Sequence, residues 1–236
     1  MIDGRISIHI PTRNRAGELA MLLQSLRTQT FQDFDILVLD DRSNTPIQAH
    51  NIIASIVARL KLEGHVVRIF RNDIPGTVCD MRNKLIDLDD LENEYTCRLD
   101  DDVVCEPDYL KLLVETLEAG YDLASGLTPP MAAPDTVRET KFVKPIINDV
   151  VLDGEGNVVK NGDDCGFNYF EKEIIPTPHF RSCAVYKSEV NKNVRYESNV
   201  TFFREEEFFS FRMILAGYKL AIHTGAVVLH QLPMSG

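Results

Sequence analysis

Three consecutive aspartates, Asp100, Asp101 and Asp102, lie between the segments CRL and VVC of the 236-residue sequence. Adjacent carboxylates repel one another, and burying them requires a cation that offsets the repulsion. Carboxylate oxygens suit Mg²⁺ or Mn²⁺, which proteins often hold with one or two carboxylates while substrate phosphates supply further ligands. A solvated acidic turn is the alternative, but a position directly after a predicted strand favours the metal site.

Two polar loops, PTRNR at residues 11–15 and LDDRS at residues 39–43, follow the first two predicted strands. An aspartate at the end of the second strand accepts hydrogen bonds from a ribose or a base N–H in other nucleotide-binding α/β folds. Asp40 and Asp41 are equally suited to cap the helix that follows. The pattern alone does not distinguish these two roles.

A further acidic group, Glu205, Glu206 and Glu207, opens a phenylalanine-rich helical segment. Acids in the first turn of a helix are favoured by the helix dipole, which is the purely structural explanation. His230 lies at the end of a later apolar segment. An imidazole placed beside the aspartates would complete a metal site, although an isolated histidine is usually structural.

The elements that must position these groups follow from hydrophobic periodicity in the first half of the chain. Strands are predicted over residues 5–10, 35–40, 66–70 and 95–99, and helices over residues 18–30, 46–62, 78–88 and 108–119. Pro11 is expected to end the first strand, because proline donates no hydrogen bond to a ladder. Alternation at this spacing predicts a parallel sheet with helices on both faces and ligands beyond the carboxyl ends of its strands.

Beyond residue 120 the pattern predicts a small antiparallel addition. A hairpin is expected over residues 150–159, a helix over 202–216 that ends at Gly217, and two short strands over 219–222 and 226–229. Residues 128–175, rich in proline and glycine, are expected to order over the substrate and exclude water. No linker is visible, so residues 1–236 are predicted to form one domain, with a substrate-binding half at 1–103 and a catalytic half at 104–236.

Composition excludes several classes of protein. The net charge is −11, with 25 Lys and Arg against 36 Asp and Glu, so nucleic acid is an unfavoured partner. Five cysteines without a C-x-x-C pair are typical of reduced thiols. No apolar run reaches the length of a membrane span and the first residues do not resemble a signal peptide, so we expect a cytoplasmic protein without a transmembrane segment.

Taken in order, these segments resemble family 2 glycosyltransferases with the GT-A fold. The resemblance rests on ISIHIPTRNR, QTFQDFDILVLDDRS, Gly76 with Met81, Arg82 and Asn83, YTCRLDDDVVCEPDYL, REEEFFSFRMILAGYKL and VVLH. Only residues 128–195 fall outside it. It implies a Rossmann-like nucleotide-diphospho-sugar transferase fold, in which a mostly parallel sheet has helices on both faces and a small antiparallel addition.

The resemblance also implies a nucleotide-sugar donor, with a UDP-sugar favoured over GDP- or dTDP-sugars, and a saccharide, lipid-linked or other hydroxyl acceptor. The expected donor-binding residues are Pro11, Thr12, Arg13, Asn14, Asp41, Gly76, Arg82, Asp100 and Asp101. Among them, Pro11, Arg13 and Asp41 correspond to positions that line the base pocket.

Asp100 and Asp102 correspond to the D-x-D pair of the family. By the resemblance Asp102 binds Mn²⁺ or Mg²⁺ directly, with Asp100 and His230 as further ligands. Glu206 takes the place of the general base in an inverting transfer. The family usually has Glu-Asp before the helix, whereas this chain has three glutamates, so the base is open between Glu206 and its two neighbours.

Three other functions are compatible with parts of the pattern. Asp100-x-Asp102-x-Val104 fits the opening motif of haloacid-dehalogenase-type phosphatases, with Asp100 as nucleophile, but that motif normally ends the first strand of its domain. A sugar-nucleotide pyrophosphorylase would need a glycine-rich loop, which residues 6–20 lack. A non-catalytic nucleotide-sugar-binding module is disfavoured by the carboxylates at positions 102 and 206.

Overall fold

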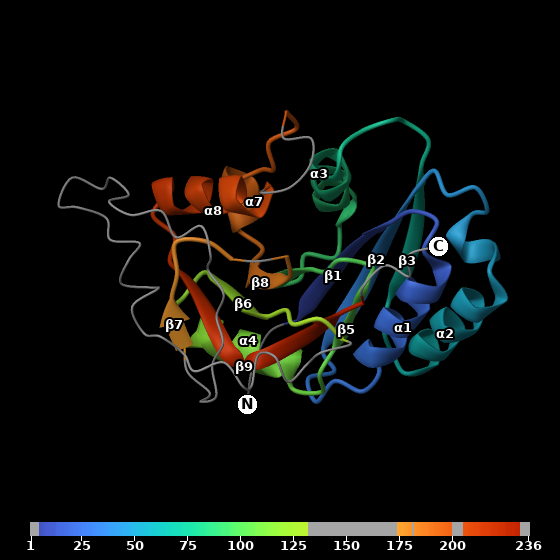
Figure 1. Ribbon diagram of the computed structural model, residues 1–236, viewed down its shortest axis with the longest axis horizontal. Helices are drawn as coiled ribbons and strands as arrows, with labels where there is room; N and C mark the ends of the chain where they lie inside the picture. Colours follow the sequence, from blue (N-terminus) through green and yellow to red (C-terminus); the bar gives the residue numbers. More distant parts are fainter. Residues whose placement is uncertain (1–4, 132–173, 181, 200–204, 232–236) are drawn as a thin grey trace.

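The computed structural model of the protein describes residues 5–131, 174–180, 182–199 and 205–231. These residues form a mixed α/β fold with helices on both faces of a nine-stranded sheet, which confirms the predicted fold class (Figure 1). The strand order is β3–β2–β1–β4–β8–β6–β9–β5, and β7 pairs with β9. The strands are β1 (Ile6–Thr12), β2 (Phe34–Asp41), β3 (Val67–Asn72), β4 (Tyr95–Arg98), β5 (Val103–Cys105), β6 (Leu123–Leu127), β7 (Ile174–Pro176), β8 (Ala184–Lys187) and β9 (Leu220–His230).

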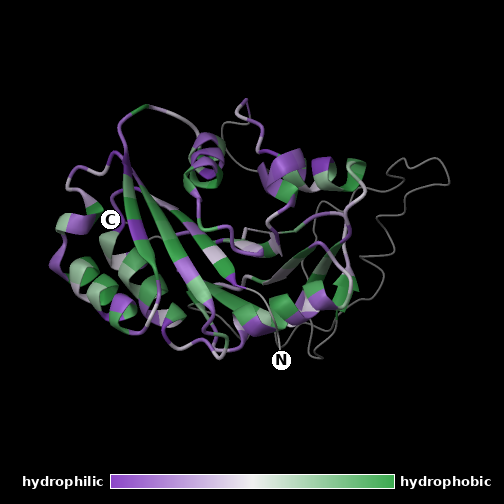
Figure 2. Cartoon of the chain, turned by 180° about the vertical axis from the view of Figure 1, so that it is seen from behind, coloured by the Kyte–Doolittle hydropathy of each residue, from purple (hydrophilic) through white to green (hydrophobic). Residues whose placement is uncertain are grey.

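The helices divide between the two faces of the sheet. The described helices are α1 (Ala16–Leu26), η1 (Ile47–Ala49, a 3₁₀ turn), α2 (Asn51–Leu62), α3 (Val78–Leu88), α4 (Tyr109–Glu118), α7 (Val190–Asn193) and α8 (Glu205–Leu215). On β2, Ile36 belongs to the core cluster that includes side chains of α1, α2 and α4, while the next residue, Leu37, belongs to a separate cluster with side chains of α3. Side chains of a strand alternate between faces, so a strand covered on both sides is apolar throughout. Figure 2 shows such strands between helices of mixed hydropathy.

The structure corrects the predicted end of the first strand, because β1 continues through Pro11 to Thr12. The backbone carbonyl of His9 accepts a hydrogen bond from Leu99 N–H. Pro11, two residues later, therefore turns its nitrogen toward the same side of the strand. The ladder between β1 and β4 ends at the pair His9–Arg98, so no donor is required from residue 11. The ladder with β2 runs on to Thr12 on the other side.

The antiparallel part of the sheet is larger than the sequence predicts. β8 lies between β4 and β6 and is antiparallel to both, and β5 is antiparallel to β9. The two short strands expected near residues 219–229 are one continuous strand, β9. β7 pairs with residues 221–223 of β9, and β9 continues through the polar residues that follow. The expected hairpin at 150–159 and nearly all of the expected segment at 128–175 lie outside the described residues.

Gly126 marks a close approach between β6 and β9, where the register of their pairing shifts. A Cβ atom at Gly126 would lie 2.2 Å from the backbone oxygen of Ala226 and 2.9 Å from the ring of Tyr109. In the described residues, no helix is long and apolar enough to cross a membrane.

We predict that Gly126→Ala lowers the free energy of unfolding by about 1–3 kcal/mol, because the added methyl group overpacks this contact. Gly17→Ala is the control, because no atom lies within 4 Å of a Cβ built at Gly17 in α1. It should leave stability unchanged or raise it by up to about 1 kcal/mol. Urea denaturation measures both, and equal stability of the two variants would contradict the close approach.

Candidate functional site

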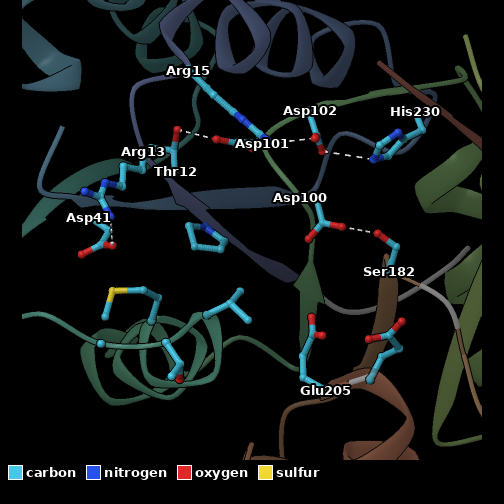
Figure 3. Close-up of a pocket in the computed structure, with 16 residues that line it drawn as sticks. Thr12, Arg13, Arg15, Asp41, Asp100, Asp101, Asp102, Ser182, Glu205 and His230 are labelled. Atoms are coloured by element: carbon cyan, nitrogen blue, oxygen red, sulfur yellow. Dashed lines mark hydrogen bonds and ion pairs between the residues drawn. The ribbon is translucent and has the colours of Figure 1, made fainter. Parts of the chain in front are cut away.

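A cavity of about 650 Å³ lies between the carboxyl ends of β1, β2 and β4 and the first turns of α3 and α8 (Figure 3). Most of the residues predicted for the site line it: Pro11, Thr12, Arg13, Asp41, Gly76, Asp100, Asp101, Asp102, Glu206 and His230. Glu205, the alternative candidate for the base, also lines it, and five further lining residues were not predicted: Arg15, Thr77, Val78, Met81 and Ser182. The topology therefore gathers groups from both halves of the chain around one cavity.

Asn14, which was predicted to bind the donor, instead connects two loops. Its backbone N–H donates to Ser43 Oγ at 2.8 Å, and its side-chain oxygen accepts from Asn44 N–H at 2.8 Å. Its φ of 55° places it in the left-handed region, which asparagine tolerates better than most residues. Asn14 shapes the rim by fixing the two loops to each other and does not line the cavity.

The structure separates the roles of Asp40 and Asp41. The buried Asp40 carboxylate accepts hydrogen bonds from the backbone N–H groups of Ser43 at 2.9 Å and Ile47 at 3.0 Å, and from Arg71 at 3.0 Å. Asp40 therefore orders the turn that leads into η1, although the N-cap positions of η1 and α2 are Pro46 and His50. Asp41, the next residue along the strand, faces the cavity instead.

Asp41 remains an ionised hydrogen-bond acceptor. Burial favours its protonated form, but hydrogen bonds from Arg42 and Asn72 outweigh burial and hold the pKa of the Asp41 carboxyl below its usual value. Arg42 Nε and Asn72 Nδ2 each lie 3.0 Å from Asp41 Oδ1, and Arg13 lies 4.0 Å from the other oxygen. The arrangement presents a carboxylate with an arginine beside it at the end of β2.

The three consecutive aspartates point in different directions (Figure 3). Asp100 accepts hydrogen bonds from Arg82 and from Ser182 Oγ. Burial opposes its charge, but the two neighbouring arginines, Arg82 foremost, hold the pKa of Asp100 below its usual value. Arg82 is itself only 3% exposed and lies behind the cavity wall. Its Nε and Nη1 have no hydrogen-bond partner among the described residues.

Asp101 and Asp102 share one arginine. Arg15 Nη1 lies 2.9 Å from Asp101 Oδ1 and 2.7 Å from Asp102 Oδ2. Asp101 also accepts a hydrogen bond from Thr12 Oγ1 at 2.7 Å. Burial nevertheless raises the pKa of Asp101 to about 6, against the opposing effects of Thr12 and Arg15. Negative charge at this position is incompletely compensated by the protein.

Asp102 and His230 form the part of the site that suits a divalent cation. Val103 pairs with His230 in the ladder of β5 and β9, and Gln231 N–H donates to the backbone oxygen of Asp102 at 2.7 Å. This pairing brings His230 Nε2 to 3.6 Å from Asp102 Oδ1. A carboxylate oxygen and an imidazole nitrogen are donors that suit Mn²⁺.

The cation would need ligands from outside the chain, because the described residues contain no group of three or more His, Cys, Asp or Glu placed to hold one. Substrate phosphates commonly fill such positions. Asp100, predicted as a further ligand, is turned toward Arg82 and Ser182. The metal set supported by this geometry is therefore Asp102 with His230.

Beneath the other end of the cavity, the guanidinium of Arg98 on β4 is completely buried. It lies 5.2 Å from the ring centre of Phe180 and 5.4 Å from that of Tyr196, and it forms an ion pair with Glu205 at 3.2 Å. An arginine with this much lost hydration needs its carboxylate partner, so Glu205 is committed to Arg98.

Glu206 lines the cavity without such a partner. Burial, followed by the charge of Glu205, raises the pKa of the Glu206 carboxyl to about 7, while Arg98 opposes the shift. A carboxylate with a pKa near neutrality is suited to accept a proton from a substrate. Glu207 does not line the cavity. The geometry favours Glu206 among the three glutamates.

Sequence reasoning missed Arg15, Ser182 and Arg98. Arg15 belongs to the PTRNR loop, so its charge next to the predicted site was a usable signal. Ser182 lies in a segment without a recognisable pattern and has a φ of 42°, which sequence does not reveal. Arg98 lies just before the aspartates in the sequence and could have been noticed there. The sequence does not reveal which of the nearby or distant acids an arginine in a strand will contact.

Comparison with known proteins assigns the chain to a family. The sequence model of the family described as glycosyl transferase family 2 matches residues 7–175, more than half of the chain. The phosphatase alternative requires Asp100 as a nucleophile, and in this structure Asp100 is bound by Arg82 and Ser182. Both findings weigh against that alternative.

One curated relative is the amylovoran biosynthesis glycosyltransferase AmsB of Erwinia amylovora, 27% identical over 125 residues. The match covers 52% of this chain and only 40% of the relative. The fold is similar to those of three solved glycosyltransferase structures. S. aureus TarS 1–349 in complex with UDP-GlcNAc has a TM-score of 0.67 at 14% identity, covering 98% of this chain and 60% of that one.

GalNAc-T7 with UDP, GalNAc and Mn²⁺ has a TM-score of 0.70 at 14% identity, covering 99% of this chain and 44% of that one. The mannosyltransferase PcManGT from Pyrobaculum calidifontis, with GDP-Man and Mn²⁺, has a TM-score of 0.65 at 14% identity, covering 99% and 58%. At this identity the likeness shows a shared fold, the GT-A fold expected from the sequence.

We predict that Asp40→Ala lowers the free energy of unfolding by about 3 kcal/mol, because it leaves two buried backbone N–H groups without their acceptor and removes one ion-pair partner of Arg71. Asp41→Ala should cost about 1 kcal/mol, since the groups it releases are closer to solvent. Urea denaturation of the two variants compares them directly. A larger loss in Asp41→Ala would reverse the assigned roles.

Proposed function

The chain belongs to glycosyl transferase family 2, and we propose that it transfers a sugar from a nucleoside diphosphate sugar to an acceptor hydroxyl. The observation that carries this proposal is the shared cavity, which is lined by Asp41, by the Asp102–His230 pair and by Glu206. These groups are suited respectively to binding a nucleoside, to holding a cation on the diphosphate and to removing a proton.

The nucleoside lies at the end of β2 in this proposal. Asp41 accepts hydrogen bonds from the base or ribose, and Arg13 and Pro11 line the same part of the cavity. Gly76 lines it from the α3 side, where a Cβ would come within 3.0 Å of Asp80 and Met81, so a larger residue would alter the wall. A UDP-sugar is the favoured donor, supported by the UDP and UDP-sugar complexes of TarS and GalNAc-T7. GDP- and dTDP-sugars are the alternatives.

The diphosphate lies near Asp102 in this proposal. Asp102 and His230 would hold Mn²⁺ or Mg²⁺, which neutralises charge on the departing nucleoside diphosphate. Arg82 lies behind Asp100, and its positive charge favours an anion on this side of the cavity. Asp100 and Asp101 help to form the wall.

Glu206 accepts the proton of the acceptor hydroxyl. As the hydroxyl oxygen bonds to the anomeric carbon, the bond from that carbon to the diphosphate oxygen breaks on the opposite face. The nucleoside diphosphate departs with the bonding electron pair, and the configuration at the anomeric carbon is inverted. This single displacement requires a base and an electrophilic clamp but no enzyme nucleophile.

The proposal assigns residues 1–103 mainly to the donor and residues 104–236 mainly to the acceptor and the base. The acceptor is a saccharide, a lipid-linked molecule or another hydroxyl compound. Both sets of residues meet at one cavity, so we treat residues 1–236 as one domain.

We predict that a UDP-sugar with Mn²⁺ raises the melting temperature of the wild-type protein. A ligand present at 100 times its dissociation constant contributes about 2.7 kcal/mol of stability. Asp41→Ala should weaken donor binding about tenfold and raise KM while leaving kcat nearly unchanged, because a contact far from the reacting carbon stabilises ground and transition states equally.

Thermal-shift titration with UDP-, GDP- and dTDP-sugars measures the first effect, and steady-state kinetics measures the second. Asp73→Ala, which removes an exposed aspartate outside the cavity, is the control. A fall in kcat with unchanged donor affinity in Asp41→Ala would contradict the base-pocket assignment.

We predict that Glu206→Gln lowers turnover by about 10²–10⁴-fold and leaves donor affinity nearly unchanged, because the base acts on the acceptor proton. The raised pKa of Glu206 also predicts how the rate depends on pH in the wild type. Glu206 must be deprotonated to act, so the transfer rate should increase as pH rises through about 7. This rising limb of the pH–rate profile should be absent from Glu206→Gln.

Glu205→Gln should move that limb to lower pH, because it removes the like charge that raises the pKa of Glu206. Glu207→Gln is the matched control and should preserve both rate and pH profile. Transfer rates measured from pH 5 to 9, with NMR assignment of the product anomer, test the set. Wild-type turnover in Glu206→Gln would reject it as the base, and a retained configuration would reject single displacement.

A further inference from the structure

Arg15 contacts the residue that we assign to the metal. Its Nη1 lies 2.7 Å from Asp102 Oδ2, while the other oxygen, Oδ1, faces His230 Nε2 at 3.6 Å. Both ends of the Asp102 carboxylate are therefore engaged by cationic or potentially cationic groups. Figure 3 shows Arg15 reaching Asp102 from the side opposite to His230.

Arg15 combines a fixed backbone with a partly exposed side chain. The residue immediately precedes α1, and its carbonyl accepts a hydrogen bond from Leu19 N–H at 3.0 Å. The side chain is 43% exposed, whereas those of Asp101 and Asp102 are 8% and 12% exposed. Side-chain rotation of Arg15 is thus enough to uncover Asp102, and no part of the sheet has to shift.

The contacts of Arg15 make it a competitor for a divalent cation. A metal ion needs lone pairs of the Asp102 carboxylate, and the guanidinium occupies those of Oδ2. It also adds a positive charge close to the position a cation would take, which disfavours the cation further. Arg15 Nη1 lies 2.9 Å from Asp101 Oδ1 as well, so it retains a partner after it leaves Asp102.

We propose that Arg15 is an internal counter-cation that competes with the divalent cation for Asp102 and keeps metal affinity low while no donor is bound. The proposal rests on the proposed function, because it takes Asp102 as the metal ligand. A donor diphosphate supplies both metal ligands and an anionic partner for the guanidinium, whose planar set of donors suits phosphate oxygens. Metal and donor therefore bind favourably together, and each binds weakly alone.

Binding of Mn²⁺ to the donor-free protein tests this directly. Titration of the full chain with MnCl₂, followed by the electron paramagnetic resonance signal of unbound Mn²⁺, gives a dissociation constant without any activity measurement. Arg15→Gln should bind Mn²⁺ on the order of three- to tenfold more tightly than the wild type, as expected for loss of a partly exposed ion pair. Circular dichroism confirms that each variant is folded.

Arg13→Gln is the matched control. It removes the same charge from the same cavity, but Arg13 lies beside Asp41 at 4.0 Å. An increase in Mn²⁺ affinity that is clearly larger in Arg15→Gln than in Arg13→Gln supports competition at Asp102. An equal increase in both variants reflects only the net charge of the cavity and overturns the proposal, as does an unchanged or weaker affinity in Arg15→Gln.

Asp102→Asn separates this inference from the proposed function. If Asp102→Asn abolishes Mn²⁺ binding while Arg15→Gln has no effect, the metal site stands and only the role of Arg15 is rejected. If Asp102→Asn binds Mn²⁺ as well as the wild type, the assigned metal site is wrong, and the role of Arg15 fails with it.

Discussion

Neutralising buried negative charge is the constraint on which the rest of the site depends. The carboxyl ends of the strands hold several acids that are largely removed from water, and each costs free energy unless a cation faces it. Three arginines from different elements meet this need: Arg82 from α3, Arg98 from β4 and Arg15 from the loop after β1. Removing any one of these arginines leaves a buried carboxylate without its compensating charge. The elements that carry the arginines, the loop after β1, β4 and α3, must therefore lie close to the acids.

The same constraint distinguishes the acids by function. Glu205 and Asp100 have arginine partners and remain charged, so their roles are largely structural. Glu206 has no arginine of its own and takes up a proton near neutral pH. Asp102 is held by a single, partly exposed arginine and so remains accessible to an incoming ion. The acids of the site thus differ in whether an arginine faces them. Those with a buried arginine form a neutralised wall, Glu206 is left as a base, and Asp102 is left as a metal ligand.

Much of the first half of the fold could be predicted, because its signals are local. The bounds predicted for α3 agree with the structure, where Thr77 caps the helix through a reciprocal contact with Asp80. The continuation of β1 through Pro11 could not be predicted, because it depends on where the neighbouring strand ends. Likewise, the contrast between Asp40 and Asp41 depends on Arg71, which reaches Asp40 from the next strand.

The second half was less predictable, because its contacts are distant in sequence. β5 contains only three residues and β8 four, too few for periodicity to be recognised. His230 could be selected by residue type, but its place beside Asp102 comes from the pairing of β5 with β9.

The ladder between β5 and β9 also has a consequence for biosynthesis. A nascent chain that extends only to β6 already contains the three aspartates, whereas the glutamates and the histidine have not yet been made. Because pairing between distant strands is slow, the cavity is completed late in folding. Until β9 arrives, the edges of β5 and β6 that it will cover are open to strands of other chains, so the step that completes the site also removes two sites for aggregation of the newly made protein.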